Sequence, residues 1–156
     1  MDRNLCKVAL RGPDGEVETL WAEDLGEGRY RLSNLPWYAY GVSEDDVVAA
    51  APDESGQLFM THVVTKSGNR TIRVLLETVE HSDQWKAESQ LAINQVVALG
   101  CTYEGANPRY VAISIPPAVE LQAVADALTA ADLRFEYADP TFEQLFPGED
   151  PGSDEE

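Results

Sequence analysis

The sequence predicts an α+β fold made of two unlike halves. Residues 1–70 carry short runs of strand-forming residues separated by turns rich in Gly, Asp and Asn, with no helical period between them. Residues 71–138 alternate such runs with two segments of helical periodicity. The first pattern is typical of a small antiparallel β-barrel or a strongly bent sheet, whose closure removes exposed strand edges.

Turn signals divide the N-terminal half into its strands. Gly and Pro set the backbone angles that tight turns require, so Pro13–Gly15, Gly26–Gly28 and Asp53–Gly56 each predict a chain reversal. The strands expected between the turns are Leu5–Arg11, Glu16–Leu25, Arg29–Ser33, Val47–Ala51 and Leu58–Thr65, and Lys66–Asn69 then turns into Thr71–Glu77.

The short run Arg29–Ser33 shows the alternation of a strand with one buried face. Successive side chains of a strand point to opposite faces. We therefore expect Tyr30 and Leu32 in the core, with Arg29 and Arg31 in solvent.

The C-terminal half begins with a helix expected from Gln84 to Leu99. Ser82 or Asp83 can accept hydrogen bonds from its first turn, and Gly100 can end it. Helical spacing gives it one apolar face, made of Trp85, Ala92, Val96 and Leu99.

The remaining elements complete a recognisable order. Strands are expected at Cys101–Gly105 and Tyr110–Ile115, a second helix from Pro117 to about Ala131, and a strand at Leu133–Tyr137. The second helix should bury Ala118, Leu121, Ala125 and Leu128. With Thr71–Glu77 as the opening strand, the order is βαββαβ, which predicts a ferredoxin-like half packed on the barrel-like half and sharing a strand with it.

The expected organisation is therefore a β-barrel-like half at 1–70, a ferredoxin-like half at 71–138 and an acidic, flexible tail at 139–156. The tail is rich in Asp, Glu, Pro and Gly, a composition typical of mobile segments. Within it, Phe142, Leu145 and Phe146 could still dock locally.

Charge excludes several classes of partner. The 156 residues include 28 acids and 11 bases, which gives a formal net charge of −17. Such a field repels phosphate backbones and anionic lipids, so we expect no binding to nucleic acid or membrane, whereas a basic protein would be attracted. No apolar run follows the N-terminus and the two cysteines cannot form a disulfide framework, so we expect a reduced, cytoplasmic setting.

A long motif string resembles a known family. It runs from Leu20-Trp-Ala-Glu through Gly28-Arg-Tyr-Arg-Leu and Asn34-Leu-Pro-Trp-Tyr-Ala-Tyr-Gly-Val-Ser to Asp46-Val-Val, and continues at Ser67-Gly and Leu99-Gly-Cys-Thr-Tyr-Glu-Gly. This string resembles the bacterial family called domain of unknown function 4265, up to about Tyr137. Members often carry a histidine after the Ser-Gly pair, where this chain has Asn69. The resemblance implies no catalytic residue, because the family has no established activity.

The strongest candidate site follows Pro36, which should end the preceding strand because it lacks an amide hydrogen. Trp37, Tyr38 and Tyr40 then lie on a loop or on the start of a short strand, next to Glu44, Asp45 and Asp46. Rigid aromatic rings beside carboxylates suit a surface that receives a cationic group. The ordinary alternative is that Trp37 and Tyr40 fill the barrel core while the acids line a solvated turn.

Other reactive patterns are weak. Three consecutive acids cannot converge on one cation, and no spaced calcium loop is present, so we expect no metal site and no cofactor. A triad of Cys101, His62 and a distant acid is formally open, but a buried cysteine and an uninvolved histidine are the ordinary interpretation. The turn Ser67–Arg70 could bind an anion, although a hairpin turn is the simpler interpretation.

These observations favour a non-enzymatic acidic binding protein that engages a basic protein partner, with an immunity or antitoxin-type inhibitor as one concrete version. The alternative is a small-ligand-binding sensor or an unrecognised enzyme with a cleft between the two halves. A structural subunit of a larger assembly is a third interpretation. The identity of the partner and the oligomeric state do not follow from the residues.

Overall fold

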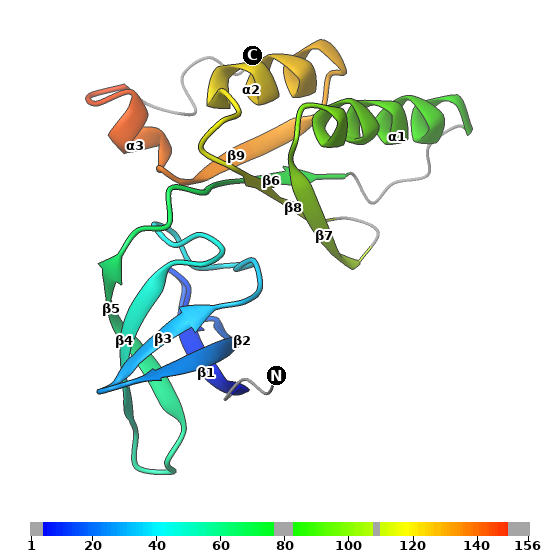
Figure 1. Ribbon diagram of the computed structural model, residues 1–156. Helices are drawn as coiled ribbons and strands as arrows, with labels where there is room; N and C mark the ends of the chain where they lie inside the picture. Colours follow the sequence, from blue (N-terminus) through cyan, green and yellow to red (C-terminus); the bar gives the residue numbers. More distant parts are fainter. Residues whose placement is uncertain (1–4, 77–82, 108–109, 150–156) are drawn as a thin grey trace.

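The computed structural model describes residues 5–76, 83–107 and 110–149. The chain forms two β-sheets of five and four strands with few helices, a mixed α+β architecture (Figure 1). The five-stranded sheet occupies one half of the molecule, and the four-stranded sheet with its helices occupies the other. Each described strand belongs to one sheet only, so the expectation that the halves share a strand was wrong.

The N-terminal half is a closed five-stranded barrel. Its strands are β1 (Leu5–Arg11), β2 (Val17–Gly26), β3 (Arg29–Leu32), β4 (Val47–Pro52) and β5 (Leu58–Thr65), paired in sequence order. Consecutive strands are antiparallel, but β1 and β5 pair in parallel. A meander of five strands reverses direction four times, so its first and last strands run the same way where the barrel closes. We had expected an antiparallel barrel, and four of its five strand pairs are antiparallel; the closing pair β1–β5 is the exception.

Alternation fills the barrel interior as predicted. Tyr30 and Leu32 are buried, whereas Arg29 is exposed and Arg31 is half-buried. The buried members of this core are Val8, Leu10, Leu20, Ala22, Tyr30, Leu32, Ala39, Val42 and Val48. Ala39 and Val42 belong to the segment between β3 and β4, so this segment closes one end of the barrel.

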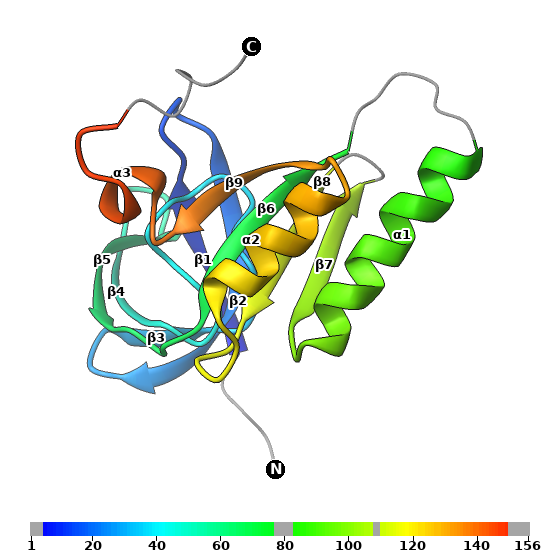
Figure 2. The ribbon, with the colours of Figure 1, turned by 90° about the horizontal axis from the view of Figure 1, so that it is seen from above.

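The C-terminal half consists of β6 (Arg70–Leu75), α1 (Asp83–Ala98), β7 (Thr102–Asn107), β8 (Tyr110–Ile115), α2 (Leu121–Ala130) and β9 (Arg134–Asp139). The sheet order is β7-β8-β6-β9, and all neighbouring strands are antiparallel. Both long helices cover the sheet face that points away from the barrel (Figures 1 and 2). The core beneath them is made by Ile72, Val74, Ala92, Ile93, Val96, Cys101, Val111, Ile113, Ile115, Val124, Leu128 and Leu133.

The helices differ from the prediction in two places. Ala92 and Val96 are buried as expected, but Leu99 is 44 % exposed, because α1 ends at Ala98 and the chain turns away. The side chain of Trp85 and residues Glu77 and His81 lie outside the described part. The second helix begins at Leu121 and not at Pro117.

The late start of α2 has a local cause. The guanidinium of Arg70 donates hydrogen bonds to the carbonyl oxygens of Pro116 and Val119, and the amide of Val119 bonds back to the carbonyl of Pro116. These bonds hold residues 116–119 as a turn, so Ala118 is exposed and does not join the buried face. Ala125 and Leu128 are buried as predicted.

The chain after β9 continues into the short helix α3 (Phe142–Leu145). Thr141 accepts a hydrogen bond from the Gln144 amide, and the Gln144 side chain bonds back to the amide of Thr141. The rings of Phe142 and Phe146 lie 6.4 and 6.0 Å from that of Tyr137. Residues 139–149 therefore contain local structure. No helix in the described ranges is both long and apolar enough to cross a membrane.

Candidate functional site

The segment between β3 and β4, residues 33–46, carries all six predicted site residues and joins the two halves. The amide of Gly41 donates to the carbonyl of Ala138 on β9 at 2.8 Å. Thr71 and Arg73 contact the same segment from β6, and alternation along β6 puts them on the sheet face opposite to the buried Ile72 and Val74. The segment thus lies against the sheet face that the helices leave open.

Glu18 of β2 fixes the start of this segment. Its carboxylate accepts hydrogen bonds from three consecutive amides, those of Trp37, Tyr38 and Ala39, at 2.6, 2.9 and 3.0 Å. Three amides converging on one carboxylate hold the chain after Pro36 in a single path. This acid therefore has an internal role, although it lies in the motif-rich part of the sequence.

Arg73 lies against the aromatic segment, residues 37–40, that the sequence analysis singled out. Its side chain is 0 % exposed, and its guanidinium lies 4.7 Å from the centre of the Tyr40 ring. Nη1 donates to the carbonyls of Pro36 and Ala39, and Nε donates to Glu136 at 2.9 Å. The Tyr40 ring therefore already has a cation from the protein itself, and the carboxylate that pairs with this cation is Glu136, not one of the three acids at 44–46.

Two tyrosines complete this cluster. The hydroxyls of Tyr40 and Tyr110 both donate to the Glu136 carboxylate, at 2.6 and 3.2 Å, and the Trp37 and Tyr110 rings lie 5.8 Å apart. Burial raises the pKa of both tyrosines, and the nearby Glu136 raises each further. Both hydroxyls therefore stay protonated and act as donors near neutral pH. Nη2 of Arg73 finds no acceptor among the described residues.

A second ionic cluster, centred on Lys66, lies beside the first. Lys66 donates to Asp46 at 2.6 Å and to Asp139 at 2.5 Å, and the Ser43 hydroxyl donates to Asp139 at 2.6 Å. Asp46 is 0 % exposed and also accepts from the amides of Ser43 and Ser67. Burial lowers the pKa of Lys66, but its bonds and charges with Asp139 and Asp46 outweigh burial and raise the pKa above its ordinary value. The Lys66 side chain remains 45 % exposed, so this cluster is open to solvent on one side. We call these two clusters together the seam: Ser43, Asp46, Lys66, Arg73, Glu136 and Asp139.

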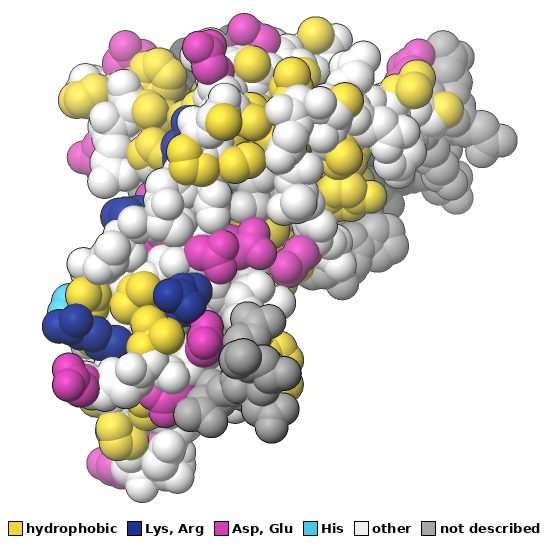
Figure 3. Space-filling model, in the orientation of Figure 1, with side chains coloured by type: hydrophobic (Ala, Val, Ile, Leu, Met, Phe, Trp, Pro, Cys, Tyr) yellow, Lys and Arg dark blue, Asp and Glu magenta, His cyan; other side chains and the backbone are white. Residues whose placement is uncertain are grey.

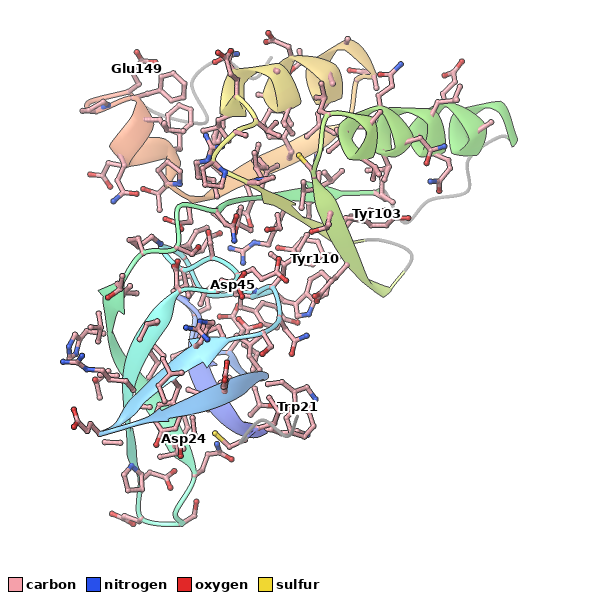
Figure 4. The ribbon with its side chains drawn as sticks, in the orientation of Figure 1. Trp21, Asp24, Asp45, Tyr103, Tyr110 and Glu149 are labelled. Atoms are coloured by element: carbon pink, nitrogen blue, oxygen red, sulfur yellow. The ribbon has the colours of Figure 1, made fainter. Side chains whose placement is uncertain are left out.

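The remaining two acids of the segment lie outside the seam. The carbonyl of Glu44 accepts from the Ser67 hydroxyl and the Asn69 side-chain amide, so Asn69 has a structural contact here. Asp45 is exposed and has a φ of 70°. Figure 3 shows acidic side chains gathered at the waist between the halves, the level at which Figure 4 labels Asp45.

Glu104 of β7 completes this group from the other half of the molecule. Burial raises the pKa of Glu44, a hydrogen bond with Ser114 opposes that rise, and the charges of Asp45 and Glu104 add to it. Among the described residues, the four ion pairs include none of these three acids. We call Glu44, Asp45 and Glu104 the acidic surface.

The structure thus divides the six predicted residues. Trp37 is half-buried against Tyr110, while Tyr38 and Tyr40 are exposed by 44 % and 40 %. Glu44 and Asp45 reach the surface, but Asp46 is buried and used internally.

The other reactive candidates stay apart: His62 is exposed on β5 beside Thr61, and Cys101 is buried under α1. No group of three metal-ligating side chains occurs in the described part of the chain.

Sequence reasoning missed Glu18, Lys66, Arg73, Glu136 and Asp139. One of them carried a local signal, because Arg73 lies between Ile72 and Val74 in a strongly apolar strand. An ionised side chain inside such a strand points to a buried partner on the opposite face. The others lie in ordinary alternating or turn sequences.

Comparison with known proteins gives a family and a fold. The family described as "Domain of unknown function (DUF4265)" matches residues 18–135. A solved structure, described as "Novel crystal structure of a hypothetical protein from Neisseria gonorrhoeae", is similar with a TM-score of 0.66 and 18 % identity, over 91 % of this chain and 98 % of that chain. At this identity the likeness concerns the fold alone. No curated protein matches the chain.

Proposed function

The chain belongs to the DUF4265 family, and we propose that it is a non-enzymatic acidic binding protein that engages a basic protein partner. One observation carries this proposal. Glu44, Asp45 and Glu104 come from both halves of the molecule and converge without an ion pair among the described residues. By contrast, the seam acids Asp46, Glu136 and Asp139 all lie in ion pairs, since Lys66 pairs with both aspartates and Arg73 pairs with Glu136.

The electrostatic state of Glu44 supports a cationic partner. Its pKa is raised by burial and by the charges of Asp45 and Glu104, so the ionised form is held at a cost. A lysine or arginine placed beside the three acids would favour that ionised form. Binding should therefore strengthen as the pH rises through the raised pKa of Glu44.

Two exposed rings on the segment that carries Glu44 and Asp45 can add contact area for a partner. Tyr38 and Tyr40 present part of their rings to solvent while Glu18 and Glu136 fix their positions. Rigid aromatic side chains lose little entropy on binding, which is why they are common at interfaces. The concrete version of the proposal is an immunity or antitoxin-type inhibitor of a basic effector. A net charge of −17 would speed the association of such an inhibitor with its effector.

A comparison of two variants with equal charge tests the proposal. The first carries Glu44→Gln, Asp45→Asn and Glu104→Gln. The control carries Glu27→Gln, Glu54→Gln and Asp132→Asn, which neutralise three exposed acids elsewhere. Each protein is immobilised and exposed to extract of the native host cells at low and high salt. Basic proteins should be retained by the wild type and the control at low salt only, and lost by the first variant. Equal retention by both variants, or none by the wild type, would contradict the proposal.

The alternative, a small-ligand sensor or enzyme with a site between the halves, is favoured by a different observation. The buried Nη2 of Arg73 lacks an acceptor among the described residues, and a carboxylate or carbonyl group would supply one. A thermal-shift screen against carboxylate metabolites tests this, since a ligand selective for the folded state raises the melting temperature. Shifts that persist in Arg73→Lys would count against it.

We also propose that residues 71–138 form a ferredoxin-like half, next to a barrel-like half at 1–70 and a tail at 139–156. The order β6-α1-β7-β8-α2-β9 and the antiparallel pairing of all neighbours support this assignment. A cytoplasmic location belongs to the same proposal, and the two free cysteines, Cys6 and Cys101, support it.

A further inference from the structure

The strand β7 lies at one edge of the four-stranded sheet. It pairs with β8 alone, so every second residue directs its N–H and C=O away from the sheet. No other segment of the described residues pairs with this outer edge. The opposite edge, β9, is followed directly by α3, and an isolated bridge joins Ala138 to Thr141. The edge of β7 is therefore unpaired among the described residues, whereas the end of β9 is occupied at Ala138.

The two faces of β7 differ in chemistry. Thr102 and Glu104 pair with Ser114 and Ala112 and share one face of the sheet. The hydrogen bond between Glu44 and Ser114 places Glu44 on that same face. The acidic surface therefore flanks the open edge on the side of the barrel.

The side facing the helices offers apolar contacts instead. Tyr103 alternates with Glu104 and is 44 % exposed, and Leu99, at the end of α1, is exposed to the same extent. Tyr103 lies on β7 as labelled in Figure 4. A strand added to β7 would meet carboxylates on one face and apolar groups on the other, because its side chains also alternate.

We propose that the basic partner docks by adding an extended strand to the free edge of β7, with lysine or arginine at alternate positions facing Glu104, Glu44 and Asp45. The intervening side chains are apolar and lie toward Tyr103 and Leu99. This inference rests on the proposed function, because it takes the basic partner from it and specifies how that partner binds. Backbone hydrogen bonds would give affinity, and the alternating side chains would give specificity.

Charge complementarity favours this occupant over a second copy of the chain. Two copies paired through β7 would bring two acidic surfaces together on a protein whose net charge is already −17. Like charges opposed across neighbouring strands are destabilising. A basic strand removes that repulsion and neutralises the three acids.

Three synthetic peptides test the mode of docking. The first is a seven-residue peptide of alternating lysine and valine. The second and third have the same sequence but carry N-methyl groups on two amides along one edge or along the other edge. N-methylation removes the hydrogen-bond donors from one edge and leaves charge and side chains unchanged. Affinity is measured by calorimetry at low salt, and the binding position by amide chemical shifts in NMR.

Strand addition predicts that only one of the methylated peptides loses affinity, by about tenfold or more for two lost bonds. The amide shifts of Thr102–Gly105 should change on binding of the parent peptide, and binding should weaken in the variant with Glu44→Gln, Asp45→Asn and Glu104→Gln. The control variant at Glu27, Glu54 and Asp132 should bind as the wild type does.

Other outcomes overturn the inference. Equal affinity of all three peptides would indicate attraction by charge alone, and the proposed function would then survive without strand addition. Failure of the parent peptide to bind, or binding that ignores the three acids, would exclude β7 as the docking edge for a basic strand. The host-extract experiment decides the proposed function separately, so the two failures are distinguishable.

Discussion

The seam and the acidic surface meet in one segment, where two consecutive acids have opposite surroundings. Asp46 accepts hydrogen bonds from Lys66 and two amides and has no exposed surface, whereas Asp45, the preceding residue, projects into solvent. The chain has 28 acids and only 11 bases. The seam sets two of these bases, Lys66 and Arg73, against three acids, so nearly all of the net charge of −17 lies outside it.

The first prediction removes the central cation of the seam. Arg73→Met should lower the free energy of unfolding by about 3–5 kcal/mol, because Glu136 and two carbonyls lose a buried partner. Urea unfolding measures the change, and Arg29→Met on the exposed side of β3 is the control. A loss below about 1 kcal/mol, similar to that of a surface substitution, would show that the seam is not needed for stability.

The second prediction compares the adjacent acids directly. Asp46→Asn should lower the free energy of unfolding by about 2–4 kcal/mol, because it weakens the pairing of Lys66 and leaves buried hydrogen-bond donors poorly matched. Asp45→Asn removes the same charge where asparagine tolerates the φ of 70°, so its effect should be within about 0.5 kcal/mol. If urea unfolding shows a similar loss of unfolding free energy for both variants, the seam and the acidic surface do not differ in their contribution to stability.

The third prediction has the smallest effect and the opposite sign. Glu44 has a raised pKa in the folded protein, so ionisation opposes folding as the pH rises through that value. Glu44→Gln should therefore raise the melting temperature at pH 7, by less than about 2 °C because the group is partly exposed. The gain should vanish below about pH 4, where glutamate is protonated in both states.

Melting curves across that pH range, by circular dichroism, measure this prediction. Asp132→Asn, at an exposed site outside the acidic surface, is the control and should show no comparable gain. A stabilisation that persists at low pH would have another origin than charge. A destabilisation at neutral pH would mean that the hydrogen bond of Glu44 with Ser114 outweighs the cost of burying its charge.

The barrel could be predicted from the sequence because its signals are local. Turn residues recur between short runs, and alternation at Arg29–Leu32 already separates the buried from the exposed face. The seam could not be predicted in the same way. Lys66 meets Asp139 across 73 positions, and Arg73 meets Glu136 across 63. Nothing in the run Glu44–Asp46 distinguishes the acid that is buried from the two that are not.

The aromatic motif lies beside a cation that the sequence analysis did not name. Rings beside carboxylates indicated a cationic partner, and in the structure the Tyr40 ring lies against Arg73 of the same chain, whose carboxylate partner is Glu136. The sequence carried a hint in the position of Arg73 between two buried residues. Its partner could not be named, because the carbonyls of Pro36 and Ala39 are backbone groups that any sequence possesses.

The bond between Lys66 and Asp139 has a consequence for the order in which the molecule matures. The ribosome synthesises the chain from the N-terminus onward. The five barrel strands end at Thr65, so all of them emerge well before Asp139 is synthesised. Until then Ser43 and Lys66 lack one of their acceptors, and the segment between β3 and β4 has no complete sheet to rest on. The two halves therefore become one unit only after the chain has been delivered through Asp139.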